Sequence, residues 1–168
     1  MLSAKIVDTT FSEMKFIIDL YENTFPSEEK VPLSNIKRTF GNGGNLYVLF
    51  DDSEMVGSFY MFDDSDVTFL VYIAIRNDLR GKGYGSDALN IIRGLRHRVF
   101  LVMEEPDGTD IKDRRKEFYL RNGCCVPGFM LLSDDVMFDA VTLCGDISES
   151  RMNEAVKRYE DVHNGRIC

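Results

Sequence analysis

Apolar residues follow two spacings along this chain, and each spacing predicts one kind of element. Continuous or alternating apolar runs predict about seven strands, over residues 4–8, 46–50, 55–62, 67–75, 99–103, 125–132 and 136–143. Apolar residues three and four positions apart predict five helices, over residues 10–25, 32–40, 88–95, 110–121 and 152–159. The predicted order is β, α, α, β, β, β, α, β, α, β, β, α.

Two short acidic turns, residues 51–54 and 63–66, separate the three central strands. Connections this short join only antiparallel neighbours, so we expect a β-meander. The apolar run 99–103 follows a helix, which predicts a strand buried on both faces and parallel to the strand before it. The sequence therefore predicts an α/β fold with a mixed sheet, one parallel crossover at its centre and helices on both faces.

The length of 168 residues is typical of one domain that buries a core without disulfides or metal ions. The 44% of hydrophobic and 11% of aromatic residues exclude a disordered protein. We expect residues 1–145 to form the functional domain. Residues 146–168 are expected to form a C-terminal helical tail that packs on this domain or extends it.

The charge balance is acidic, with 20 Lys and Arg residues, 28 Asp and Glu residues and a net charge of −8 at pH 7. Binding to nucleic acid needs a basic surface that displaces counterions, so the balance argues against a nucleic-acid partner. An acidic field would concentrate a cationic substrate, although the same charge also serves solubility.

Four cysteines, at positions 124, 125, 144 and 168, form no metal-binding or redox motif, and no metal site is expected. Their number and spacing indicate reduced thiols, and the N-terminal residues lack the pattern of a signal peptide. The longest apolar run, residues 67–75, is too short to span a bilayer. We therefore expect a cytoplasmic protein without membrane association.

A glycine-rich loop lies between a buried strand and the start of a helix, with the sequence Arg80-Gly81-Lys82-Gly83-Tyr84-Gly85-Ser86. Glycines let the backbone turn tightly and point consecutive N–H groups outward, and the helix dipole adds partial positive charge. The loop therefore predicts a binding site for phosphate or pyrophosphate. A tight loop without a ligand is the alternative.

Two known phosphate-binding motifs fit this loop incompletely. A Walker A motif requires Ser or Thr after Gly-Lys, and here a glycine follows the lysine. In a dinucleotide-binding motif, Gly81 and Gly83 would take the first two glycine positions, but Ser86 takes the third. Glu104 and Glu105 end the next strand, where that motif has its ribose-binding acid, but the later hairpin argues against a dinucleotide domain.

A third motif fits better. The pattern Arg80-x-x-Gly83-x-Gly85 follows a strand that ends in residues 72–75, and it resembles the acetyl-CoA-binding motif of the GCN5-related N-acetyltransferases, Gln/Arg-x-x-Gly-x-Gly/Ala. Residues 117–123 resemble the helix end Phe-Tyr-x-x-x-Gly of that family. The resemblance covers residues 67–125. It implies two central parallel strands that splay apart, and acetyl-CoA as the co-substrate.

The resemblance also assigns roles to residues of the loop and of the strand before it. It implies that backbone N–H groups hold the CoA pyrophosphate, those of Gly81, Lys82, Gly83, Tyr84, Gly85 and Ser86. The main chain of Ile73 and Ile75 would pair with pantetheine as an added strand does. The N–H of Ile73 or Ala74 would polarise the thioester carbonyl. Arg80 and Lys82 would contact phosphate, with solvation as the alternative.

Tyr119 is the candidate for the catalytic acid. The resemblance places it beside the CoA sulfur, where a phenol with a pKa near ~10 can donate a hydrogen bond or a proton to the leaving thiolate. A core aromatic residue is the alternative interpretation.

The general base is less clear, because the glutamate that the family often has on the strand before the loop is absent from residues 67–75. Glu104 and Glu105 are the nearest substitutes by topology, and strand alternation aims only one of them inward. Glu28 and Glu29 are expected near the amine. The family also frequently has an asparagine where this chain has Lys112. For each glutamate, a solvated surface carboxylate is the alternative.

These observations predict an acyltransferase that moves an acetyl group from acetyl-CoA to a primary amine by direct attack in a ternary complex. The acceptor would be a small-molecule or peptide amine, and a homodimer is compatible with this function. Two other classes stay open, a CoA-binding module without catalysis and a nucleotide-binding regulatory module.

Overall fold

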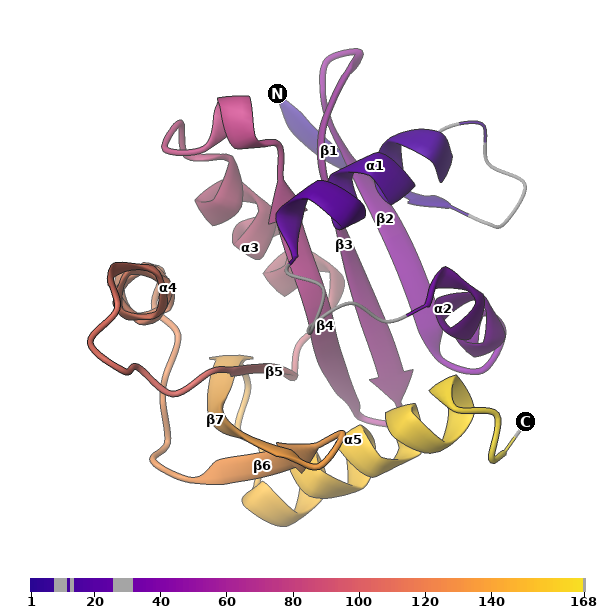
Figure 1. The fold of residues 1–168 in the computed structure, drawn as a ribbon, viewed down its shortest axis with the longest axis vertical. Coiled ribbons are helices and arrows are strands. Elements are labelled where there is room, and N and C mark those ends of the chain that lie inside the picture. The colour runs from indigo at the N-terminus through magenta and orange to yellow at the C-terminus, as the bar shows by residue number, and fades with distance from the viewer. Residues whose placement is uncertain (8–11, 13, 26–31, 168) are drawn as a thin grey trace.

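The structure is a computed structural model that describes residues 1–7, 12, 14–25 and 32–167 (Figure 1). Its strands are β1 (Leu2–Val7), β2 (Gly44–Asp51), β3 (Glu54–Asp64), β4 (Val67–Ile75), β5 (Val99–Met103), β6 (Met130–Ser133) and β7 (Val136–Cys144). Its helices are α1 (Met14–Thr24), α2 (Leu33–Thr39), α3 (Tyr84–Leu95), α4 (Asp110–Arg121) and α5 (Glu149–His163), with a short 3₁₀ helix, η2 (Asn77–Leu79), before α3. The predicted order of helices and strands is confirmed.

The strands form one seven-stranded sheet in the order β1-β2-β3-β4-β5-β7-β6. β2, β3 and β4 pair antiparallel, as the short acidic turns predicted. β4 pairs with β5 in parallel, and α3 provides the long crossover that parallel pairing requires. The predicted α/β fold with a mixed sheet is therefore confirmed.

The sheet opens at its centre. The register between β4 and β5 contains Thr68 opposite Val99 and Phe69 opposite Phe100, and it extends no further along the described strands. β4 nevertheless continues to Ile75, so most of its length runs without β5 beside it. This opening is the splay that the family resemblance implies.

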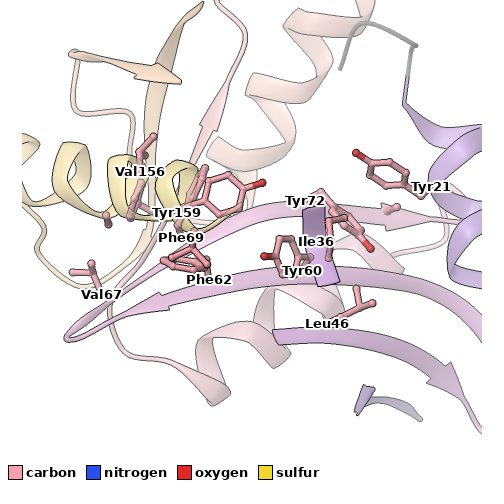
Figure 2. Close-up of a cluster of buried hydrophobic side chains, with 14 of the residues drawn as sticks. Tyr21, Ile36, Leu46, Tyr60, Phe62, Val67, Phe69, Tyr72, Val156 and Tyr159 are labelled. Carbon is pink, nitrogen blue, oxygen red and sulfur yellow. The ribbon is translucent and has the colours of Figure 1, made fainter. Parts of the chain in front are cut away.

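Helices cover both faces of the sheet, and each face has its own buried cluster. α1, α2 and α5 pack on one face, where Tyr21, Ile36 and Tyr159 are buried (Figure 2). α3 and α4 pack on the other face through residues that include Ile92 and Tyr119. In Figure 1, α1 and α2 lie in front of the sheet and α3 lies behind it. The sheet thus separates two packed layers, and its central opening lies between them.

The strand predicted over residues 125–132 is shorter in the structure. β6 begins at Met130, and Cys125 instead forms an isolated bridge to β7. Pro127 has no N–H to donate, and Gly128 has a φ of 91°, in the left-handed region. These two residues interrupt the ladder, which the apolar pattern alone did not indicate.

Hydrogen bonds connect the C-terminal helix α5 to the β3–β4 turn. Arg151 donates from Nη1 to Asp64 Oδ2 at 2.9 Å and from Nε to Asp66 Oδ1 at 3.0 Å. Met152 and Val156, on the inner side of the helix, are buried in the first cluster. α5 therefore packs into the core, and the division of the chain at residue 145 stays a prediction.

Candidate active site

The glycine-rich loop ends at the N-terminus of α3. Gly81 and Gly83 have φ values of 77° and 93°, which glycine adopts without strain. No side chain among the described residues caps the helix at Gly83, and its first hydrogen bond runs from Asp87 N to Gly83 O at 3.1 Å. The N–H groups of residues 84–86 therefore have no acceptor within the helix and are available to an anion.

The loop is open on the side where side chains at Gly81 and Gly83 would project. A Cβ built at Gly81 or at Gly83 would meet no described atom within 4 Å. Arg80 and Lys82 are both exposed on the same loop. Two cations, the helix dipole and the outward N–H groups thus form a cradle with the charge and space that a pyrophosphate needs.

The backbone of β4 offers free hydrogen-bonding groups beside this cradle. Arg76 N donates to Val56 O of β3 at 2.9 Å, and Ala74 follows the same register. Because strand backbones alternate, the N–H and C=O groups of Ile73 and Ile75 face away from β3, towards the opening. Of the two N–H groups expected to polarise a carbonyl, that of Ile73 faces the opening and that of Ala74 faces β3.

A β-bulge in β4 marks the place where the sheet opens. Tyr72 lies opposite Tyr60, but the next pair is Leu70 opposite Met61, so Val71 is the extra residue. A bulge bends its strand and increases the local twist. This bulge directly follows the last pair between β4 and β5, and it explains physically why the two strands separate there.

Tyr119 lies in the last turn of α4 and is 7% exposed. It belongs to the buried cluster that contains Leu101 and Met103 of β5, the strand that borders the opening. Its hydroxyl makes no hydrogen bond with a described residue. Burial raises the pKa of Tyr119 to about 12, while the charge of Arg115 acts in the opposite direction. The phenol therefore keeps its proton at neutral pH, as a catalytic acid must.

Glu104 and Glu105 directly follow β5 and differ in their surroundings. Glu104 is half-buried, with its Oε2 3.6 Å from Lys112 Nζ, whereas Glu105 is exposed. Lys112 Nζ also lies 2.9 Å from Asp107 Oδ2, and these contacts, chiefly the bond to Asp107, raise the pKa of Lys112. Lys112 stands where the family frequently has an asparagine, and its contact with Glu104 links the start of α4 to the end of β5.

The structure describes only part of the side of the sheet on which the amine is expected. Glu28 and Glu29 lie outside the residues that the structure describes. A pocket of about 350 Å³ lies between α1 and the end of β4, and its lining consists of Phe16, Asp19, Leu20, Asn23, Thr24, Arg76 and Asn77. Because α1 and α3 pack on opposite faces of the sheet, this pocket and the glycine cradle approach the end of β4 from opposite sides.

The sequence did not indicate the side chains of the β2–β3 turn that form hydrogen bonds with residues in and just before the glycine-rich loop. The Tyr84 hydroxyl donates to Asp51 Oδ2 at 2.8 Å, and Arg76 Nη1 donates to Glu54 Oε1 at 2.6 Å. These partners lie 33 and 22 positions apart, so no local spacing could indicate them. The antiparallel meander was the only signal, because it brings the turn between β2 and β3 to the end of β4.

Within the part of the chain that the structure describes, no group of three or more His, Cys, Asp or Glu side chains is placed to hold a metal ion. Within the same residues, no helix has the length and apolar character needed to cross a membrane.

Solved structures with the same fold include several acetyltransferases. A protein assigned to the GNAT acetyltransferases of Bacteroides thetaiotaomicron matches with a TM-score of 0.77 and 20% identity, over 95% of this chain and 96% of that chain. A GNAT family acetyltransferase from Elizabethkingia anophelis with acetyl-CoA bound matches with a TM-score of 0.55 and 13% identity, over 84% and 94%. A Bacillus subtilis acetyltransferase in complex with CoA matches with a TM-score of 0.57 and 14% identity, over 84% and 95%.

Sequence comparison leads to the same group of proteins. No curated protein matches the chain. The model of the acetyltransferase (GNAT) family, however, matches residues 14–107, which is more than half of the chain and includes the glycine-rich loop and the opening of the sheet. The chain therefore belongs to the acetyltransferase (GNAT) family.

Proposed function

We propose that this protein transfers an acetyl group from acetyl-CoA to a primary amine by direct attack in a ternary complex. One observation carries the proposal: the N-terminus of α3, which no side chain caps and which glycines precede, follows a strand with a free backbone edge after only η2 and the glycine-rich loop. The first feature matches the pyrophosphate of CoA, and the second matches its amide-containing pantetheine arm.

Each part of the cradle has a role in this proposal. The N–H groups of residues 81–86 bind the pyrophosphate, with Arg80 and Lys82 beside them. The free N–H and C=O groups of Ile73 and Ile75 pair with the pantetheine amides. Acetyl-CoA supplies the acyl group in activated form, as a thioester.

The chain's own residues then act on protons and charge. The N–H of Ile73 stabilises the negative charge that develops on the carbonyl oxygen. The amine gives up a proton to Glu104 or Glu105, directly or through water, and the Tyr119 hydroxyl donates a hydrogen bond or a proton to the departing sulfur. The raised pKa of Tyr119, about 12, keeps the hydroxyl protonated, so that it can act as this donor.

The amine is proposed to arrive from the α1 side. The pocket between α1 and β4 contains the carboxylate of Asp19 and two apolar side chains, Phe16 and Leu20. Together with a net charge of −8, this favours a small-molecule or peptide amine that is cationic in solution. A spermidine N-acetyltransferase chimera shares the fold, with a TM-score of 0.60 and 15% identity, which supports including polyamines among the amines tested.

The test is acetyl-CoA consumption, measured as release of free thiol, with a panel of a polyamine, an aminoglycoside, an amino acid, a peptide N-terminus and a lysine peptide. We expect at least one amine to accelerate thiol release. In parallel, CoA and acetyl-CoA should raise the melting temperature, because a ligand at a hundred times its Kd adds ~2.7 kcal/mol of stability.

The two readouts separate the alternatives. Stabilisation by CoA without turnover of any amine would indicate a CoA-binding module without catalysis. Equal stabilisation by NAD, ATP and CoA would contradict the proposal and indicate a nucleotide-binding module.

A further inference from the structure

The turn between β2 and β3, residues 51–54, contacts the glycine-rich loop from outside on both of its flanks. On the downstream flank, the Tyr84 hydroxyl donates a hydrogen bond to Asp51 Oδ2 at 2.8 Å. Tyr84 is the first residue of α3 and directly follows the left-handed Gly83. The other carboxylate oxygen, Asp51 Oδ1, accepts from the Met1 ammonium at 2.9 Å.

The upstream flank is held by Arg76, which directly follows β4. Arg76 Nη1 donates to Glu54 Oε1 at 2.6 Å and to Met55 O at 3.1 Å. Its Nε and Nη2 form a two-pronged contact with Asp78 of η2, at 3.1 and 2.6 Å. One guanidinium thus joins β3, the end of β4 and η2.

We infer that the β2–β3 turn is a positioning element for the pyrophosphate loop, with Asp51 acting through Tyr84 and Glu54 acting through Arg76. This inference rests on the proposed function, because it takes residues 80–86 as the site of the CoA pyrophosphate. Asp51 and Glu54 are positioning residues, since neither is placed against the ligand itself.

Chain flexibility gives the physical reason for such an element. The loop contains Gly81, Gly83 and Gly85 within five residues, and glycine loses more backbone freedom on ordering than any other residue. An unsupported loop would lose that freedom when the anion binds, and affinity would fall accordingly. Two contacts to a tight hairpin turn fix the loop beforehand, one at Arg76 before the glycines and one at Tyr84, between Gly83 and Gly85.

Electrostatics explains why the contacts are made by these groups. The turn and η2 place three carboxylates, those of Asp51, Glu54 and Asp78, around a site proposed to bind an anion. Arg76 pairs with two of them, Glu54 and Asp78, and its hydrogen bond lowers the pKa of Asp78. Asp51 accepts hydrogen bonds from the Tyr84 hydroxyl and the Met1 ammonium. The two cations therefore offset part of the negative charge that would otherwise repel phosphate.

The experiment is a double-mutant cycle read out as CoA affinity. Calorimetry would measure the Kd of CoA for the unsubstituted protein, Tyr84→Phe, Asp51→Ala and the double variant. Tyr84→Phe removes only the hydroxyl that contacts Asp51, and we expect it to weaken CoA binding about tenfold, as loss of a hydrogen bond to a charged group predicts. The double variant should bind no more weakly than Asp51→Ala alone, because the two residues act through one contact.

The matched control is Asp52→Asn, which removes one charge from the same turn. Asp52 contacts neither Tyr84 nor Arg76, and asparagine tolerates its φ of 54°. We expect its Kd for CoA to stay within about twofold of the unsubstituted value, a change within the scatter of a surface substitution. In steady-state kinetics, Tyr84→Phe should raise the KM for acetyl-CoA and leave kcat nearly unchanged, which a general loss of folding would not do.

The outcomes distinguish this inference from the proposed function. If the unsubstituted protein does not bind CoA, the proposed function fails and the inference fails with it. If that protein binds CoA and Tyr84→Phe binds it equally well, the inference alone is wrong. Should Asp51→Ala not fold, hydrogen exchange of the amides of residues 80–87 in Tyr84→Phe decides, because an unchanged exchange rate would also overturn the positioning role.

Discussion

Gly85, in the first turn of α3, lies against the ring of Phe118 in α4. A Cβ built at residue 85 would lie 3.1 Å from Phe118 Cζ, closer than side-chain carbons normally approach. A Cβ at Gly83 would instead meet open space, although its φ of 93° strains any other residue. The two glycines of the motif therefore serve different needs: Gly85 lets two helices pack closely, and Gly83 forms the cradle.

Gly83→Val should abolish CoA binding and leave the protein folded. A valine side chain would project into the open space proposed for phosphate, and its left-handed backbone would add a strain of ~1–3 kcal/mol. Calorimetry with CoA and a circular dichroism melt would measure both effects. The same substitution at Gly94, exposed near the end of α3, is the control. Unchanged CoA affinity in Gly83→Val would show that the loop does not hold the pyrophosphate.

Tyr119→Phe should lower turnover ~100-fold with little change in CoA affinity. The hydroxyl has no hydrogen-bond partner among the described residues, so its removal should barely change the melting temperature. Because burial raises the pKa of Tyr119 to about 12, its ionisation should not reduce the rate below about pH 11.

Steady-state kinetics would measure this effect. Tyr159→Phe makes the same chemical change in the buried cluster on the opposite face and serves as the control. Turnover of Tyr119→Phe that matches that control would support the interpretation of Tyr119 as a core residue.

Glu104→Gln and Glu105→Gln should differ in their effect on the rate. Glu104 is half-buried beside Lys112, and Glu105 is exposed, so we expect Glu104→Gln to lower the rate at least ~10-fold and Glu105→Gln to change it little. With the unsubstituted protein, the rate should rise with pH until the base is deprotonated. Rate against pH for both variants, with an active amine, would decide between them.

The base assignment and the charge argument have separate controls. A normal rate and pH profile in both glutamine variants would rule out both glutamates as the base. If an acidic field attracts a cationic amine, the rate should also fall with added salt, because charges are screened beyond ~8 Å at physiological ionic strength. A rate that does not depend on salt would remove this part of the proposal.

His163 should make the protein less stable in mild acid. The residue is 2% exposed at the end of α5, its ring packs on Tyr159, and neither ring nitrogen has a hydrogen-bond partner among the described residues. Burial lowers the pKa of His163 below the usual 6.5. The unfolded chain then binds a proton more readily than the folded protein, so this contribution is present above pH ~6.5 and is lost as the pH falls through the folded pKa.

The measurement compares urea unfolding of the unsubstituted protein and His163→Leu at pH 7.5, 6.5 and 5.5. Leucine does not titrate, so the stability of the variant relative to the unsubstituted protein should rise towards pH 5.5. His97, which is exposed before β5, provides the control as His97→Leu. A constant difference between His163→Leu and the unsubstituted protein would mean that His163 titrates equally in both states.

The sequence by itself determined most of the elements and the position of the loop. Apolar spacing is a local property, so the meander over β2, β3 and β4 and the parallel strand β5 could be predicted from it. The glycine-rich stretch between Arg80 and Ser86 could also be recognised from the sequence, because glycine is the residue that most readily adopts the left-handed backbone of tight turns. Tyr119 was found only through the family resemblance.

Contacts between distant residues were decided by the tertiary structure. Val71 is the extra residue of a β-bulge, because the register between β3 and β4 shifts at that point. The apolar pattern of the two strands does not indicate such a shift. His163 lies at the end of the predicted C-terminal helical tail, for which the sequence left open packing on the domain or extending it, and packing of α5 on the sheet buries the residue. The contact between Asp51 and Tyr84 likewise exists only once the meander has folded, because 33 positions separate the two residues and only strand pairing brings them together.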